Sequence, residues 1–237
     1  MLIVDDFSLF FIFLLSTVGL ITILQSFTYI EEHGINFAEF YPLIMFSLFG
    51  MMLMAAATDM LTLFLGIETA SVPIYVMVGM IRRRTESAEG ALKYFVMGAI
   101  ASAFLVYGMA LVFGATGATN LKDIYYAFHK MGGIAAEPMA LMGLVMILVG
   151  LGFKLALVPF HMWAPDAYEG APTFITSFMA TGVKAAGFAA VLRVLLISFP
   201  QAVMTDISIG WVDILPWIAV LTMTLGNLVA LVQKNIK

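Results

Sequence analysis

The apolar residues of this 237-residue chain fall into long runs that are separated by short polar stretches. Each run approaches the length of about 20 residues that a helix needs to cross the hydrocarbon core of a bilayer. The pattern predicts an all-α membrane protein whose residues 1–237 form a single transmembrane domain. The predicted spans lie near residues 7–27, 40–57, 60–80, 90–114, 138–163, 173–199 and 211–232.

Two of the connections between these runs carry further information. The second and third runs are joined almost without a loop at Thr58–Asp59, which predicts a tight antiparallel hairpin. The longest connection, 115–137, contains the segment NLKDIYYAFHKM at 120–131, which is either a short helix at the membrane interface or an ordinary solvated connection. As an interfacial helix it would turn Tyr125, Tyr126 and Phe128 toward lipid headgroups, and Lys122, Asp123 and Lys130 toward water.

Composition supports the membrane interpretation and excludes a soluble enzyme. The chain is 62% hydrophobic and 11% charged, whereas soluble domains contain about 25% charged residues. It has no cysteine, so it has no thiolate metal site, iron–sulfur ligation or cysteine nucleophile. The three histidines, His33, His129 and His161, are too scattered to suggest a metal site.

Lysine and arginine are distributed unequally between the two sets of loops. One side carries most of them, and the other carries Lys122 and Lys130. The positive-inside rule therefore predicts that the loop with Arg82–Arg84 is cytoplasmic and that the N-terminal Asp5 and Asp6 are outside. The richer side consists of Arg82, Arg83, Arg84, Lys234 and Lys237.

Three ionisable residues interrupt the apolar runs at positions where charge is costly. Glu68 and Lys184 lie about 12 and 16 Å into their spans at a rise of about 1.5 Å per residue. A charge at the bilayer centre costs roughly 2.5–3.5 kcal/mol. Glu68 and Lys154 could form a salt bridge that merely fixes helix packing, but the sequence offers no obvious acid for Lys184.

The stretch after Lys154 is rich in proline and polar residues, which predicts a broken helix. Pro159 cannot donate to the carbonyl of Leu155, and a carbonyl freed there would favour the nearby ammonium of Lys154. Burial favours the neutral form of an unpartnered lysine, and a nearby carboxylate favours its charged form. Glu68, Lys154 and Lys184 are therefore predicted to form a proton relay. His161 is either a further relay group or a histidine that hydrogen-bonds a loop.

Several motifs resemble the antiporter-like membrane subunits of respiratory complex I, the NADH–quinone oxidoreductase, and among them the subunit N branch. The motifs are LFLGIETASVPIYVMVG at 63–79, ALKYFVMGAIASAFLVYGMALVFGATG at 91–117, VGLGFKLALVPFHMWAPDAYEGAP at 149–172, TGVKAAGFAAVLRVL at 181–195 and GNLVALVQKNIK at 226–237. The resemblance implies a five-helix repeat with a discontinuous helix, formed by the second to sixth spans. It also implies that the chain is incomplete, lacking two leading helices and, after Lys237, about half of the bundle.

The same resemblance implies a function and partners. It makes Glu68, Lys154 and Lys184 the residues that carry protons, driven by quinone reduction in other subunits. It places FMN and iron–sulfur clusters in those partner subunits, with no cofactor in this chain. The expected location is the bacterial inner membrane, beside other complex I membrane subunits. Two alternatives remain: a subunit of a multisubunit cation/proton antiporter, and a structural membrane anchor.

Overall fold

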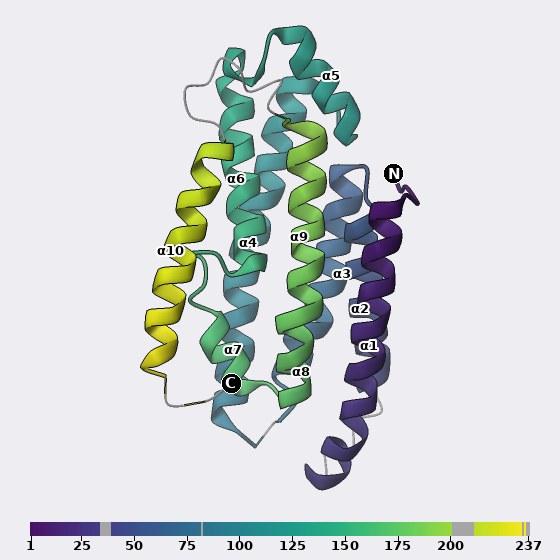
Figure 1. Cartoon of the computed structure of the whole chain (residues 1–237), viewed down its shortest axis with the longest axis vertical. Coiled ribbons are helices and arrows are strands. Elements are labelled where there is room, and N and C mark those ends of the chain that lie inside the picture. Colours follow the sequence, from purple (N-terminus) through teal and green to yellow (C-terminus); the bar gives the residue numbers. More distant parts are fainter. Residues whose placement is uncertain (34–38, 82, 201–210, 234, 236–237) are drawn as a thin grey trace.

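Long helices run side by side along one axis of the computed structural model (Figure 1). The structure describes residues 1–33, 39–81, 83–200, 211–233 and 235. Arg82, Lys234 and Lys237, which contributed to the predicted charge asymmetry, lie outside the described residues. The helices are α1 (Asp6–His33), α2 (Phe40–Ala56), α3 (Met60–Val78), α4 (Thr85–Thr116), α5 (Leu121–Met131), α6 (Pro138–Leu155), α7 (Ala164–Gly170), α8 (Thr173–Phe178), α9 (Lys184–Arg193) and α10 (Trp211–Leu231).

The membrane character of the bundle follows from the length of these helices and their composition. Within the described ranges, six helical segments are long and apolar enough to cross a bilayer, and the shorter α2 is apolar as well. Together they overlap all seven predicted runs. The all-α membrane class is confirmed.

Helices α2 and α3 form the predicted hairpin, and two glycines let them approach closely. A Cβ atom on Gly50 would lie 2.3 Å from the backbone nitrogen of Ala70, and one on Gly66 would lie 2.9 Å from that of Met54. Asp59 caps α3 because its side chain accepts a hydrogen bond from the amide of Leu61 at 3.0 Å. The backbones of the two helices therefore touch without intervening side chains.

Helix α6 ends earlier than the predicted boundary at residue 163. Its last residue is Leu155, and Ala156 takes a left-handed conformation with φ of 53°. The amide of Leu157 then donates to the carbonyl of Gly152 at 2.9 Å, a bond typical of a helix C-cap. The helix is thus closed before Pro159, so the expected cause of the break is wrong although the break itself exists.

The sixth span is continuous but not uniformly α-helical. Between α8 and α9 lies the π-helical segment η2 (Met179–Val183), and after α9 lies a second one, η3 (Val194–Ser198). Such π-helical turns are rare and occur frequently at functional sites. Lys184 is the first residue after η2.

The segment 120–131 is a helix, α5, at one end of the bundle (Figure 1). Lys122, Asp123 and Lys130 are exposed as expected, and Tyr126 is 62% exposed. Phe128 contradicts the expected orientation, because it is fully buried and its ring lies 5.6 Å from that of Phe199. The helix uses this phenylalanine to attach itself to the end of the sixth span.

Different charged segments lie at the two ends of the bundle. The N-terminal end of α1 lies at the same end as α5, and α7 lies at the opposite end (Figure 1). Asn235 near the C-terminus donates to Glu169 of α7 at 3.1 Å. The start of α1 and helix α5 therefore lie at one end of the bundle, and Glu169 and Asn235 lie at the other.

Candidate functional site

Helix α3 turns one polar face toward its neighbours in the middle of the bundle. Glu68, Ser71 and Tyr75 are three or four residues apart, so they lie on the same side of the helix. Glu68 is half-buried and accepts a hydrogen bond from the hydroxyl of Ser102 of α4 at 2.5 Å. The carboxyl group is thereby held between α3 and α4.

Lys154 lies in the last turn of α6 and meets that same face of α3. It is only 4% exposed, and its Nζ donates to the hydroxyl of Ser71 at 2.5 Å and lies 3.5 Å from the hydroxyl of Tyr75. Ser71 in turn donates to the carbonyl of Ile67. The C-terminal end of a helix favours a cation, so both the helix end and the hydroxyl groups stabilise the ammonium.

Glu68 and Lys154 do not form a direct ion pair. The ion pairs within the described residues lie elsewhere, and each of these two side chains has a hydroxyl partner instead. A salt bridge that only locks the helices is therefore not what the structure contains. Lys154 contacts Ser71, which lies one helical turn from Glu68, and not Glu68 itself.

The break after α6 is held in a defined position by its aromatic residue. Trp163 is 1% exposed, and its indole nitrogen donates to the carbonyl of Phe153 at 3.0 Å. Its ring stacks on that of Tyr94 at 4.2 Å with an interplanar angle of 10°. The break is folded back against α4 and α6.

Helix α7, which follows the break, is tied to α4 at its outer side. Lys93 of α4 forms ion pairs with Asp166 at 2.8 Å and with Glu89 at 2.6 Å. The two helices approach closely at Gly90, where a Cβ would lie 2.5 Å from the carbonyl oxygen of Asp166. The segment that carries His161 and Trp163 is therefore attached at both of its ends.

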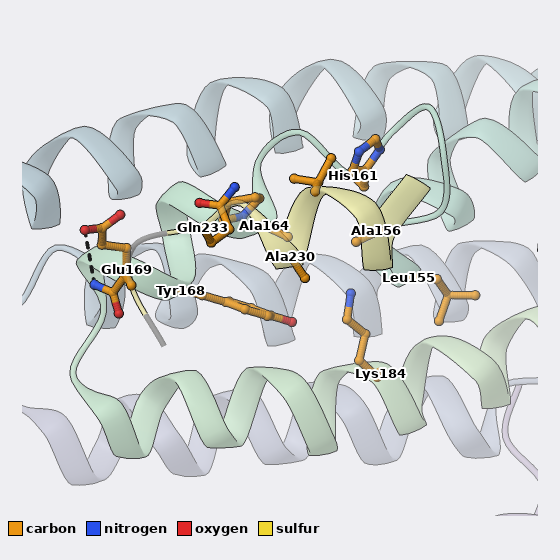
Figure 2. A pocket seen from close by; sticks show the side chains of 13 residues that line it. Leu155, Ala156, His161, Ala164, Tyr168, Glu169, Lys184, Ala230 and Gln233 are labelled. Atoms are coloured by element: carbon orange, nitrogen blue, oxygen red, sulfur yellow. Dashed lines mark hydrogen bonds between the residues drawn. The ribbon is translucent and has the colours of Figure 1, made fainter. Parts of the chain in front are cut away.

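Lys184 points from the sixth span toward this broken segment (Figure 2). Its Nζ is buried and has no hydrogen-bond partner within the described part of the chain. The ammonium instead lies over the ring of Trp163, 5.1 Å from its centroid. This agrees with the sequence, which offered no acid for Lys184.

A cavity of about 370 Å³ opens beside Lys184, and polar groups from three segments line it (Figure 2). His161 of the break lies above Lys184, and its Nδ1 is buried without a partner among the described residues. Burial raises the pKa of Tyr168 to about 12, so its phenol stays neutral. The lining residues are Leu155, Ala156, His161, Ala164, Pro165, Tyr168, Glu169, Lys184, Gly226, Val229, Ala230, Gln233 and Asn235.

The structure thus divides the four predicted site residues into two groups. Glu68 and Lys154 lie along one face of α3, whereas His161 and Lys184 share the cavity. No cluster of three or more histidine or acidic residues that could hold a metal ion occurs in the described residues.

Sequence reasoning missed the hydroxyl and ring partners of these charges. Ser71 and Tyr75 could have been found from their helical spacing to Glu68. Ser102 could not, because only the packing of α4 on α3 brings it to the carboxyl group.

Sequence reasoning also missed a buried arginine at the other end of the bundle. Arg193 is 5% exposed and forms two hydrogen bonds to Asp5, at 2.8 and 2.6 Å. Its guanidinium lies 4.7 Å from the ring centroid of Phe7. The arginine holds the pKa of Asp5 well below its usual range.

An apolar helical bundle that holds a half-buried carboxylate and two buried lysines around a discontinuous helix defines the class of antiporter-like membrane subunits. A family model described as "NADH:quinone oxidoreductase/Mrp antiporter, TM" matches residues 57–237. The chain belongs to this family of antiporter-like membrane subunits.

Individual relatives agree with the family assignment. The chain is 50% identical over 237 residues to NADH-quinone oxidoreductase subunit N of Trichlorobacter lovleyi, covering 99% of this chain and 47% of the relative. It is 47% identical over 238 residues to subunit N 1 of Sorangium cellulosum, again covering 47% of that protein. The chain therefore spans about half the length of the curated relatives it matches.

A solved structure gives the same result at the level of the fold. A chain of respiratory complex I from Thermus thermophilus with bound aureothin matches with a TM-score of 0.76 and 38% identity. The match covers 99% of this chain and 47% of the Thermus chain. The resemblance found in the sequence motifs is confirmed.

Proposed function

We propose that this chain is the proton-translocating part of a subunit of the subunit N type in an NADH–quinone oxidoreductase. Quinone reduction, FMN and the iron–sulfur clusters belong to partner subunits in this proposal, and the chain itself binds no cofactor. The observation that carries the proposal is the buried ammonium of Lys184, which has no hydrogen-bond partner in the described residues and adjoins a polar cavity. A lysine kept in this state at a cost of roughly 2.5–3.5 kcal/mol can exchange its proton.

The groups around each charge support a relay from Glu68 through Lys154 to Lys184. The hydroxyl of Ser71 accepts from Lys154, and a hydroxyl can both accept and donate a proton. A carboxylate that moves toward Lys154 would favour its charged form, and one that moves away would favour proton release. The cavity beside His161 and Lys184 is far larger than the volume that one water molecule needs, so a hydrated path to the lysine is sterically possible.

The proposal includes a location and an orientation. Residues 1–237 form one transmembrane domain in the bacterial inner membrane, among other membrane subunits of the same complex. The end that carries Arg83 and Arg84 faces the cytoplasm by the positive-inside rule, and the N-terminal Asp5 and Asp6 face outward. His161 serves as a further relay group at the cytoplasmic approach to Lys184.

A subunit of a multisubunit cation/proton antiporter remains the second candidate, because the family description includes antiporters of that kind. The relatives reported above are named as NADH-quinone oxidoreductase subunits and favour the first candidate. Copurification with flavin and iron–sulfur proteins distinguishes the two, since only the oxidoreductase contains them. A structural anchor, the third candidate, is opposed by the missing ion pair between Glu68 and Lys154.

The test replaces the unpartnered lysine in the complete complex. Lys184→Met keeps length and packing, and Lys184→Arg keeps a charge that is not released near neutral pH. Both variants should assemble and lose most proton translocation per NADH oxidised in sealed vesicles. Lys130→Met, which removes an exposed lysine of α5, is the matched control and should pump normally.

Normal pumping by both Lys184 variants would refute the relay and leave the anchor. Pumping that follows a sodium or potassium gradient without any NADH oxidation would instead assign the chain to a cation/proton antiporter. Assembly is checked separately by native gel, so that a loss of pumping is not confused with a loss of the subunit.

A further inference from the structure

A continuous series of aromatic rings connects the two buried lysines. Lys154 lies 5.7 Å from the ring centroid of Tyr75, and Tyr75 packs edge-on against Tyr94 at 4.6 Å. Tyr94 stacks on Trp163 at 4.2 Å, and Lys184 lies over Trp163 at 5.1 Å. The rings come from α3, α4 and the break after α6, so three segments contribute to the series.

Trp163 is held on several sides within this series. It is 1% exposed, and its indole donates to the carbonyl of Phe153, the residue beside Lys154. Tyr94 occupies one face of the indole, and Tyr168 approaches edge-on at 6.1 Å. A ring fixed on so many sides presents a defined surface to the ammonium of Lys184.

That surface matters because no hydrogen bond from the described residues holds the Nζ of Lys184. Its Nζ has no hydrogen-bond partner in the described residues, whereas Lys154 has two hydroxyl groups within reach. The face of an indole attracts a cation through the ring quadrupole, and indole is the strongest of the aromatic side chains in this respect. A neutral amine carries no charge for the ring to attract, so the ring holds Lys184 only while the lysine is protonated.

We propose that Trp163 is a positioning residue that holds the protonated Lys184 against its ring face and, stacked on Tyr94, separates Lys184 from Lys154. The inference deepens the proposed function and rests on it. Tyr94 strengthens the separation, because its buried hydroxyl has no hydrogen-bond partner in the described part of the chain and so provides no fixed step between the lysines. Proton transfer between Lys154 and Lys184 then requires a path around the rings of Tyr94 and Trp163, or a movement of these rings.

The contact itself is tested by ultraviolet resonance Raman spectroscopy of tryptophan in the assembled complex. The difference between wild type and Lys184→Met should show a change in the indole bands at neutral pH. The same difference, measured in a Trp163→Phe background, should show no change in the indole bands. Any change that remained there would come from other tryptophans of the complex, so this background is the control for them. Identical difference spectra in the two backgrounds would overturn the contact.

The role of the contact is tested by proton translocation per NADH oxidised. Trp163→Leu removes the ring and should lower coupled proton transfer by roughly 30-fold, the effect of losing a desolvated cation–π contact. Trp163→Phe loses the bond to Phe153 but keeps a ring, and should retain activity within about threefold of wild type. This rescue by a ring would not occur if the indole served only to anchor the break through its hydrogen bond.

Three outcomes separate the two proposals. Normal pumping in Trp163→Leu with lost pumping in Lys184→Met overturns the positioning role and leaves the relay intact. Equal losses in Trp163→Leu and Trp163→Phe also overturn it, because a ring alone then has no effect. Normal pumping in Lys184→Met overturns the relay, and with it any role of Trp163 in proton transfer.

Discussion

Replacing Asp5 by asparagine should loosen the attachment of α1 to the sixth span. Asp5 accepts two hydrogen bonds from Arg193, which is 5% exposed and also donates to the carbonyl of Ala55 at 3.0 Å. The change keeps the shape of the side chain and removes its charge. It leaves a buried guanidinium without its counter-ion, at the point where α1, α2 and α9 meet.

The size of the effect follows from the burial of the two partners. Removing one member of a fully buried ion pair costs about 3–5 kcal/mol. The side chain of Asp5 is 35% exposed, so solvent compensates part of this cost and about 2 kcal/mol remains. At about 1.4 kcal/mol per factor of ten, local opening should become roughly 30-fold more frequent.

Hydrogen–deuterium exchange of the complete protein in lipid nanodiscs measures this opening directly. Peptides over residues 185–198 should exchange roughly 30-fold faster in Asp5→Asn than in wild type. Asp6→Asn is the matched control, since Asp6 is the exposed neighbour with the same chemistry, and it should leave exchange unchanged. Equal exchange in the two variants would mean that the ion pair does not hold α1 in place.

The same pair gives the stability a predictable dependence on pH. The pKa of Asp5 is lower in the folded protein than in the unfolded chain. The stabilisation that ionised Asp5 gives to the folded state is therefore fully present above the unfolded pKa of about 3.9. This stabilisation is lost as pH falls from the unfolded pKa through the folded one. Exchange in wild type, corrected for the intrinsic rate, should therefore converge on that of Asp5→Asn at acidic pH, whereas Asp5→Asn should show no such change.

Three further substitutions test other features of the bundle. Glu68→Gln keeps the hydrogen bond to Ser102 possible and removes the charge, so assembly should persist while proton translocation per NADH falls; normal pumping would refute a role for the carboxylate. Gly50→Val places a side chain against the backbone of α3 and should lower the free energy of unfolding by about 1–3 kcal/mol in thermal unfolding. The control Gly114→Ala should be nearly neutral, because the added Cβ meets only the flexible end of Met139. Pro159→Ala should leave α6 ending at Leu155, because the bonds that close the helix do not involve residue 159; a structure with a helix continuing through 159 would contradict this.

The spans and the buried charges could be predicted because both depend on local composition. Uninterrupted apolar runs have few alternatives to a membrane helix, and a charge within such a run is conspicuous whatever its neighbours are. The orientation of α5 could not be predicted in full. Phe128 fits an interfacial helix by its position in the sequence, and only the arrival of Phe199 from the far end of the sixth span explains its burial.

The partners of the charges depend on packing between helices, which the sequence does not specify. Lys154 and Ser71 are 83 positions apart, and Arg193 and Asp5 are 188 apart. A position near the end of a span allows an arginine to reach water, so the sequence alone gives no reason to expect that Arg193 is buried. Its burial requires α1 to pack against α9 at that level.

Each of the three proposed relay residues lies beside an interruption of regular α-helical hydrogen bonding. Pro73 has no amide to donate to the carbonyl of Thr69, the residue after Glu68. Lys154 lies two residues before the left-handed Ala156, and Lys184 follows the π-helical η2 directly. In an apolar bundle, such interruptions persist only where other protein groups or water satisfy the backbone.

The interruptions and the charges therefore have a common physical basis. A regular helix in a membrane satisfies its own backbone and offers nothing polar to a buried side chain. An interrupted helix exposes carbonyl or amide groups and admits the side chains of a neighbouring segment, as Trp163 is admitted beside Phe153. The places where local sequence preference and regular structure disagree are where functional sites are expected. In this chain, the interruptions coincide with the three deep charges of the proposed relay, Glu68, Lys154 and Lys184. The proposed chemistry therefore lies at the interrupted positions and not along the long regular helices.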